Sequence, residues 1–233
     1  MKRVILICLC VLGVNSFAQT NQDLIKHYEA YYKQMKKQGD IQGVINGLTH
    51  LNLLKPSQAR EDTLSLVYMS EGKYRQALNT IGIKNNATDS DIAIEVKAIS
   101  LKALNELERA SIFFEKMFNR KPDVSIAYEL AESYLQTNQL EKAKTYTSYG
   151  VENSTNEMKK TFYETQQPYQ VSFKAAFLHL DALITFNKNK KANADSAVDI
   201  LDEALKLAPN FNLAQLTKNA LLQQKQQINN QQD

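Results

Sequence analysis

A repeat of 33 residues is the feature that most restricts how this chain can fold. Small or medium-sized apolar residues recur at this interval, and one more follows after an insertion. Regular self-similarity at a period of about 20–50 residues indicates an array, in which each repeat is one supersecondary unit stacked on its neighbours. The recurring positions, called anchors below, are Val44, Ala77, Ala110, Ala143 and Ala197.

The residues before each anchor predict a tight turn between two helices. Five residues earlier stand Gly39, Gly72, Asn105 and Asn138. Glycine and asparagine tolerate the left-handed backbone conformation that ends a helix. Large apolar residues suited to the start of a buried helix face come two positions later, at Ile41, Tyr74, Leu107 and Leu140.

Small residues and prolines complete the pattern of a helix pair. Twelve residues before three of the anchors lie small side chains that would face the anchors from the first helix: Ser65, Ala98 and Ala131. Twelve residues after three anchors lie three of the chain's four prolines: Pro56, Pro122 and Pro209. Because proline cannot continue a helix, each repeat reads as helix, turn, helix and a stop.

This arrangement resembles the tetratricopeptide repeat (TPR), and the resemblance covers about residues 22–210. The best matches are Tyr68…Gly72-Lys73-Tyr74…Ala77, Ala131…Tyr134…Ala143 and Ala197…Ala204…Pro209. The family's tryptophan is absent, Val44 replaces an alanine, and Asp89 and Thr155 replace prolines. The resemblance implies an all-α, right-handed α-solenoid of stacked helix-turn-helix repeats with a C-terminal capping helix. The alternative is an ordinary helical bundle.

The repeats divide the chain into five predicted helix pairs and three other segments. The distance from Ala143 to Ala197 is 54 residues, which leaves an insertion of about 20. We expect a connector with a short amphipathic helix there, acting either as a binding face or as an exposed spacer. The predicted segments are pairs at 23–56, 57–88, 89–122, 123–152 and 169–209, the connector 153–168, the capping helix 211–224 and a Gln/Asn-rich, frayed tail 225–233.

The first 18 residues read as a secretory signal peptide. Lys2 and Arg3 form a charged start, an apolar core follows, and Ser16-Phe17-Ala18 is a small-x-small cleavage site. An uncleaved anchor is the alternative, although the apolar run is short for a bilayer. The end of this leader resembles leaders of the Bacteroidota group. It predicts an exported protein, periplasmic or secreted, with no transmembrane anchor after cleavage.

Composition excludes several classes of function for the exported chain. Both cysteines, Cys8 and Cys10, lie in the leader, so the mature chain has no disulfide and no zinc–thiolate site. Without Lys2 and Arg3, 26 basic residues face 25 acidic ones. This balance lacks the basic footprint of a nucleic-acid-binding protein.

No motif of the chain predicts catalysis. The three histidines, His27, His50 and His179, lie in different repeats and not at ligand spacing, so we expect no metal site. The sequence contains no glycine-rich phosphate loop and no nucleophile elbow. We therefore expect no enzyme activity, no catalytic residues and no cofactor.

A binding groove is the better expectation. In the TPR family the first helices of the pairs line a concave groove, which implies an amphipathic partner site here. The positions of the family's carboxylate clamp hold Glu29, Lys33, Thr63, Ile92 and Val96, so that clamp is absent. The candidate groove residues are Lys33, Asp62, Leu66, Met69, Glu95, Ile99, Lys102, Tyr128, Glu132, Leu135 and Gln136.

Two functions remain open from the sequence. The first is an exported scaffold, a non-catalytic adaptor that holds a protein or peptide partner in its concave groove. The second is a structural component of envelope assembly that self-associates as a homo-oligomer, through the last helix or the insertion. The sequence names neither the partner nor the pathway.

Overall fold

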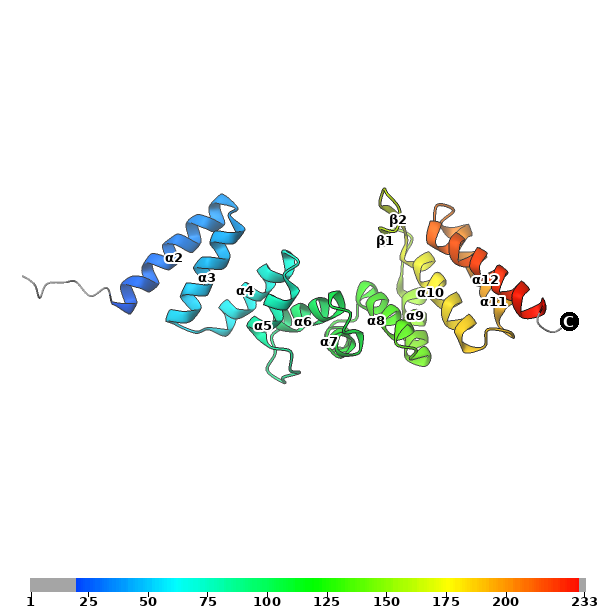
Figure 1. Cartoon of the computed structure of the whole chain (residues 1–233), viewed down its shortest axis with the longest axis horizontal. Helices are drawn as coiled ribbons and strands as arrows, with labels where there is room; N and C mark the ends of the chain where they lie inside the picture. Colours follow the sequence, from blue (N-terminus) through cyan, green and yellow to red (C-terminus); the bar gives the residue numbers. More distant parts are fainter. Residues whose placement is uncertain (1–19, 231–233) are drawn as a thin grey trace, which may run out of the picture. The chain divides into compact units, whose positions relative to one another are not determined.

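The computed structural model describes residues 20–230, so the predicted signal peptide lies outside the described residues. Within this range the chain forms helix pairs and one two-stranded sheet (Figure 1). It divides into an N-terminal unit, which ends at Gly82, and a C-terminal unit, which begins at Ile83. Each unit is a stack of antiparallel helix pairs, and we describe each by itself.

The N-terminal unit contains two helix pairs around a small core. Its helices are α2 (Asn21–Gln38), α3 (Ile41–Leu54), α4 (Gln58–Ser70) and α5 (Tyr74–Ile81). The core is built from Val44, Ile45, Leu48 and Leu64, with Tyr32 and Met35 packed against it. Each helix pair alone leaves an apolar face open, and the packing of α3 against α4 covers part of it.

The C-terminal unit contains three helix pairs, a β-hairpin and a last helix. Its core joins the last helices to the hairpin through buried aromatic and small residues, among them Tyr128, Phe162, Phe177 and Phe211. The elements are α6 (Asp91–Ala103), α7 (Leu107–Arg120), α8 (Val124–Gln136), α9 (Leu140–Asn153), β1 (Lys159–Phe162), β2 (Tyr169–Ser172), α10 (Phe173–Lys188), α11 (Ala194–Leu207) and α12 (Asn212–Asn230).

The four predicted turn residues all have the left-handed conformation. Gly39, Gly72, Asn105 and Asn138 have φ angles between 58° and 72°. In each turn the N–H of the next residue bonds, at 2.8–3.0 Å, to a carbonyl five residues earlier. This is the hydrogen-bond pattern of the Schellman motif, which satisfies carbonyls that the helix end would leave unpaired. The sequence prediction is confirmed here.

The anchors lie where two helices approach most closely. Ala77, Ala110, Ala143 and Ala197 are all 0% exposed, and Val44 is 7% exposed. The small residues predicted to face them, Ser65, Ala98 and Ala131, are also 0% exposed. Each of the three repeated prolines follows the end of a helix by two residues. Small side chains at these positions let the helix backbones pack closely.

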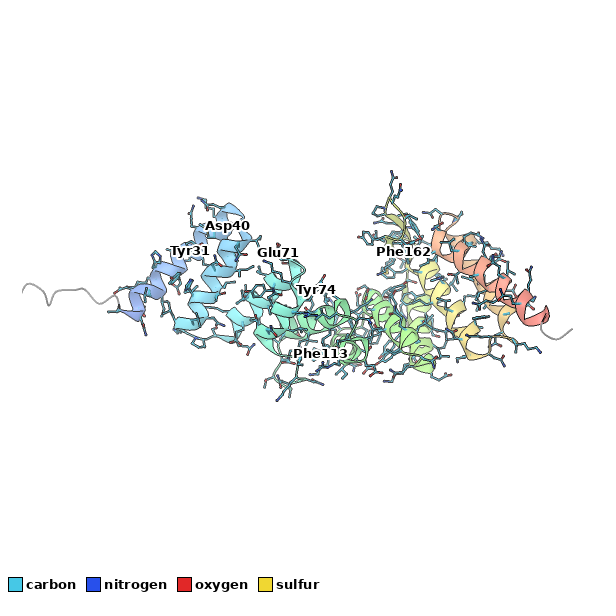
Figure 2. The ribbon with its side chains drawn as sticks, in the orientation of Figure 1. Tyr31, Asp40, Glu71, Tyr74, Phe113 and Phe162 are labelled. Atoms are coloured by element: carbon cyan, nitrogen blue, oxygen red, sulfur yellow. The ribbon has the colours of Figure 1, made fainter. Side chains whose placement is uncertain are left out.

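The predicted amphipathic helix in the insertion is wrong, because this segment forms a β-hairpin. Strand β1 pairs antiparallel with β2, from Lys159↔Ser172 to Phe162↔Tyr169. Phe162, labelled in Figure 2, is buried. Its ring lies 4.9 Å from the ring of Phe211, just before α12. Helix propensity is a weak preference that such tertiary contacts override. The following helix therefore begins at Phe173, capped by Ser172, and not at Tyr169.

The last helix is longer than the sequence suggested. The predicted capping helix ended at residue 224, whereas α12 continues to Asn230, into the segment expected to fray. Glutamine and lysine are good helix formers, and ion pairs tie α12 to α11 at Lys218–Asp202 and Lys225–Asp195. Within residues 20–230, no helix is both long and apolar enough to cross a bilayer.

Candidate functional site: a groove between three helices

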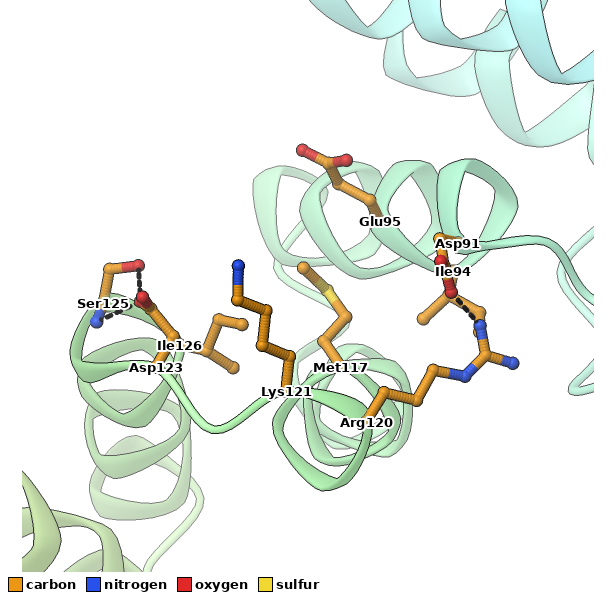
Figure 3. A pocket seen from close by; sticks show the side chains of 9 residues that line it. All are labelled: Asp91, Ile94, Glu95, Met117, Arg120, Lys121, Asp123, Ser125 and Ile126. Atoms are coloured by element: carbon orange, nitrogen blue, oxygen red, sulfur yellow. Dashed lines mark hydrogen bonds and ion pairs between the residues drawn. The ribbon is translucent and has the colours of Figure 1, made fainter.

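Two adjoining hollows lie between α6, α7 and α8 of the C-terminal unit. Their volumes are about 410 and 550 Å³. Glu95, Met117, Ser125 and Ile126 line both, so the hollows form one continuous surface, which we call the α6–α8 groove. Figure 3 shows the first hollow. The full lining is Asp91, Ile94, Glu95, Ile99, Lys102, Ala103, Phe114, Met117, Arg120, Lys121, Asp123, Ser125, Ile126 and Glu129.

Capping at the start of α8 positions one wall of the groove. Asp123 accepts hydrogen bonds from the backbone N–H of Ser125, at 2.8 Å, and from its hydroxyl, at 2.5 Å (Figure 3). These bonds lower the pKa of the Asp123 carboxyl, which keeps it anionic at the helix N-terminus, where negative charge is favoured. Because Pro122 stops α7 and Asp123 starts α8, Ile126 falls in the first turn of α8 and faces the hollow.

The second hollow has an apolar wall and a charged end. Ile99, Phe114, Met117 and Ile126 supply apolar side chains from all three helices. Such a surface suits an apolar side chain of a ligand. Removing apolar surface from water favours binding by about 25 cal/mol per Å² buried. Glu95 lines both hollows and makes no ion pair within residues 20–230, so it is free to meet a basic group.

A cluster of four charged side chains forms the other end of the groove. Lys102, at the end of α6, donates to Glu129 and, at 2.5 Å, to Glu132, both on α8. Lys160 on β1 lies 3.3 Å from Glu129. Burial alone would lower the pKa of Lys102, but attraction by the two glutamates raises it above its usual value. Burial would raise the pKa of Glu129, but Lys102 and Lys160 lower it. Lys102 and Glu129 are therefore both held in their charged forms near neutral pH.

Several candidate residues from the sequence meet in this groove. Glu95, Ile99 and Lys102 line it, and Glu132 contacts it through Lys102. Leu135 is half-buried and packs against the core, and Gln136 is exposed at the end of α8. Lys33, Asp62, Leu66 and Met69 belong to the N-terminal unit and are not among the lining residues of the α6–α8 groove.

Two candidate residues are not accessible to a partner, and their assignment as groove residues needs correction. Tyr128 is only 1% exposed, because its ring packs edge-on against Phe173 and Phe177 in the core. Asp62 is 5% exposed and accepts a hydrogen bond from Gln58 at 2.9 Å. The repeat pattern assigns both to an open helix face. The α8–α10 packing buries Tyr128, and Asp62 is held on α4 by its hydrogen bond with Gln58 one turn earlier.

Of the residues that line the groove, the sequence predicted only Glu95, Ile99 and Lys102. The prediction considered only the first helix of each pair, whereas Phe114 and Met117 come from the second helix α7. It also missed Ser125, Ile126 and Glu129 on α8. Lys160 could not be found, because its segment was expected to be helical. Met117, an apolar residue of α7 that is only half-buried, was a usable signal.

The histidines lie apart from one another, and only His179 is buried. His50 stacks on Tyr28 at 4.2 Å in the N-terminal unit, and His27 is exposed nearby. Across residues 20–230, no group of three or more His, Cys, Asp or Glu side chains is placed to hold a metal ion. His179, on α10, is 4% exposed and lies against Phe211 and α12.

The hydrogen bonds of His179 identify its neutral form. The hydroxyl of Thr217 donates to the Leu213 carbonyl at 2.9 Å, so its oxygen accepts from Nε2 of His179, also at 2.9 Å. The ring nitrogen Nδ1 is buried and has no partner among the described residues. Burial lowers the pKa of His179 to about 4, because a proton on Nδ1 would carry an unpaired charge into the core.

The protein is expected to lose stability as the pH falls below 6.5. The unfolded chain binds a proton at His179 near pH 6.5 and the folded chain only near pH 4, so acid favours unfolding. This loss of folding stability is complete near pH 4 and amounts to roughly 3 kcal/mol.

Thermal unfolding measured between pH 7 and pH 5 tests this assignment. The decrease in Tm over this range should be smaller for His179→Gln than for the wild type. His50→Gln, which changes an exposed histidine, should follow the wild type, and equal slopes in all three would contradict the assignment.

Comparisons with known proteins agree on the fold. Neither a family model nor a curated protein matches this sequence. A TPR protein from Parabacteroides merdae aligns with a TM-score of 0.59 and 15% identity, over 84% of this chain and 72% of that one. YrrB is a TPR protein described as having an unusual peptide-binding site. It aligns with a TM-score of 0.64 and 13% identity, over 82% of this chain and 90% of that one. MamA from Desulfovibrio magneticus aligns with a TM-score of 0.59 and 14% identity, over 82% of this chain and 98% of that one. This chain therefore has the fold of the tetratricopeptide-repeat α-solenoids.

Proposed function

We propose that this protein is a non-catalytic scaffold that binds an extended segment of a protein or peptide partner in the α6–α8 groove. The observation that carries the proposal is the groove itself, whose apolar wall lies between Glu95 and the Lys102–Glu129–Glu132 cluster. The TPR fold supports it, because stacked helix pairs commonly present ordered surfaces to partners. The described peptide-binding site of YrrB is consistent with this role.

The groove offers a partner one apolar contact flanked by charge. An apolar side chain would enter the hollow lined by Ile99, Met117 and Ile126. A lysine or arginine beside it would meet Glu95, which lacks an ion pair within the described part of the chain. The helices are ordered before binding, so the scaffold loses little conformational entropy when it takes up a partner.

The cellular setting of this scaffold is also a proposal. The leader-like residues 1–18 favour export, to the periplasm or outside the cell, and removal of the leader before folding. The partner would then be an envelope or secreted polypeptide. Comparing the N-terminus of the purified protein with that of the gene product would test cleavage after Ala18 directly.

Peptide selection tests the groove. The mature chain, residues 19–233, would be used to select binders from a random peptide library, and the affinities of selected peptides would be measured by calorimetry. We expect Ile126→Glu to weaken binding by about tenfold or more, because it places a carboxylate against apolar ligand atoms. Wild-type melting behaviour of the variant would show that the fold is intact.

The matched control is Ile112→Glu, the same substitution on α7. Ile112 is 44% exposed and does not line the groove, so this variant should bind as the wild type does. Equal loss in both variants would indicate unfolding or non-specific binding. Selected peptides that ignore Ile126→Glu would place the binding surface elsewhere and contradict the proposal.

Self-association is the second candidate function. Leu216 and Leu222 on α12 are 54% and 37% exposed, and Tyr163 beside the hairpin is 76% exposed. Large apolar side chains on an end helix of a stacked array can contact another copy. A mass that increases with protein concentration, and stays monomeric in Leu216→Glu, would favour this function over the adaptor.

A further inference from the structure

The β-hairpin borders the α6–α8 groove. Lys160 of β1 contacts Glu129, which lines the second hollow, and its ammonium lies 4.6 Å from the centre of the Tyr128 ring. Phe162, on the same face of the strand, anchors the hairpin in the core (Figure 2). The hairpin is therefore held firmly where the charged end of the groove meets β1.

The register determines which backbone groups of β1 point away from β2. Residues in an antiparallel pair alternate between hydrogen-bonded and non-hydrogen-bonded positions. Phe173 donates to the Met158 carbonyl at 2.9 Å, which makes that pair hydrogen-bonded. Counting along the register, Lys160 and Phe162 bond to β2, whereas Thr161, opposite Gln170, directs its N–H and C=O outward. Lys159 does the same.

The outer edges of the two strands differ. On β2 the Gln170 carbonyl points outward and accepts a hydrogen bond from the side chain of Asn210 at 3.2 Å. This bond also confirms the alternation. On β1 no residue in the range 20–230 bonds to the outward N–H or C=O of Thr161. Lys160 of β1 contacts Glu129 on α8, whereas Asn210, just before α12, contacts β2.

We propose that the free edge of β1 receives the partner as a third strand, so that an extended segment leaving the α6–α8 groove pairs with Lys159 and Thr161. This inference rests on the proposed function and specifies the conformation of the ligand. An unpaired strand edge offers alternating donors and acceptors, which only another extended backbone matches. The groove would then recognise the side chains of the partner, and β1 would recognise its extended backbone.

The strand edge makes the recognition partly independent of sequence. Hydrogen bonds to Thr161 involve the partner's main chain, so many sequences can form them, whereas the hollow near Ile126 accepts only an apolar side chain. Lys160 is already paired with Glu129 at 3.3 Å. A helical ligand could fill the hollow, but it has no free backbone groups for β1.

Amide hydrogen exchange tests this pairing, using a peptide from the library selection that requires Ile126. In the free protein the outward amide of Thr161 should exchange quickly, and the amides of Lys160 and Phe162 slowly, because they bond to β2. With peptide bound, exchange at Thr161 should slow by about tenfold or more, with little change at Lys160 and Phe162. An unchanged rate at Thr161 would overturn the inference.

A proline substitution provides the second arm. Thr161→Pro removes the outward N–H and places a ring on the edge, and it leaves the bonds between β1 and β2 intact. Peptide affinity should fall by about tenfold, whereas Thr161→Ala, which keeps the N–H, should bind as the wild type does. Slow exchange at Lys160 and Phe162 in the proline variant would show an intact hairpin.

The outcomes separate the two proposals. Peptides that need Ile126 but bind equally to Thr161→Pro and Thr161→Ala would leave the groove function standing and exclude strand addition. A peptide that is helical when bound would have the same meaning. If no selected peptide depends on Ile126, the groove function fails and the strand inference fails with it.

Discussion

Replacing Lys97 with alanine should destabilise the C-terminal unit by about 3–5 kcal/mol, because the change leaves the largely buried Asp89 carboxylate without its positively charged partner. The Lys97 side chain is 0% exposed and lies 2.7 Å from Asp89, whose side chain is 7% exposed. It also donates to the Lys84 carbonyl at 2.8 Å, and its ammonium lies 5.5 Å from the Phe113 ring centre. Urea denaturation would measure the loss as a lower midpoint at an unchanged slope.

An exposed ion pair is the control for Lys97. Arg120 pairs with Asp91, but both side chains are largely in water, at 44% and 88% exposure. Arg120→Ala should therefore cost less than about 1 kcal/mol. The double variant Lys97→Met/Asp89→Ala should recover much of the stability lost in Lys97→Ala, since apolar replacements of a buried pair are often neutral. Similar losses for Lys97→Ala and Arg120→Ala would contradict this account.

Gly150→Ala should destabilise the protein by about 1–3 kcal/mol, although alanine is the better helix former. Gly150 lies within α9, and a Cβ atom there would meet the Phe177 ring at 2.1–2.3 Å. Phe177 is 0% exposed, and its ring packs against Tyr128 at 5.4 Å and Phe173 at 6.1 Å, so it cannot move aside easily. Thermal and urea unfolding would measure the loss.

A double-mutant cycle isolates this contact. Phe177→Leu removes the ring that a Cβ at position 150 would strike, at the cost of a cavity. In the Phe177→Leu variant, Gly150→Ala should be neutral or stabilising by up to about 1 kcal/mol. The only remaining effect is then the higher helix propensity of alanine compared with glycine. The two changes would then couple strongly, as contacting residues do. Additive effects would show that Gly150 is not required for the approach of α10.

The contrast between Gly150 and the repeated turn residues explains what could be read from the sequence. Gly39 and Asn105 were predicted because the left-handed conformation is a local demand that few residue types meet. Gly150 has no such local signal. It is needed because Phe177, distant in the sequence, packs against it.

The candidate site was only partly predictable for the same reason. Glu95, Ile99 and Lys102 follow from the exposed face of a first helix, and the structure places them in the groove. Tyr128 follows from the same rule, but the packing of α10 buries it. An apolar side chain on a first helix is buried only if the next helix pair packs over it. The sequence of a single repeat does not contain this information.

The sequence by itself determined the helix pairs, their turns and the small residues between them, because these features depend on backbone conformation and steric fit at fixed positions of a repeat. Tertiary structure alone decided the rest. The hairpin exists because Phe162 reaches Phe211, and the groove's charged end exists because Lys102, Glu129 and Lys160 come together from three elements. Such contacts join residues far apart in the chain, and their energies exceed the local preferences that a sequence pattern records.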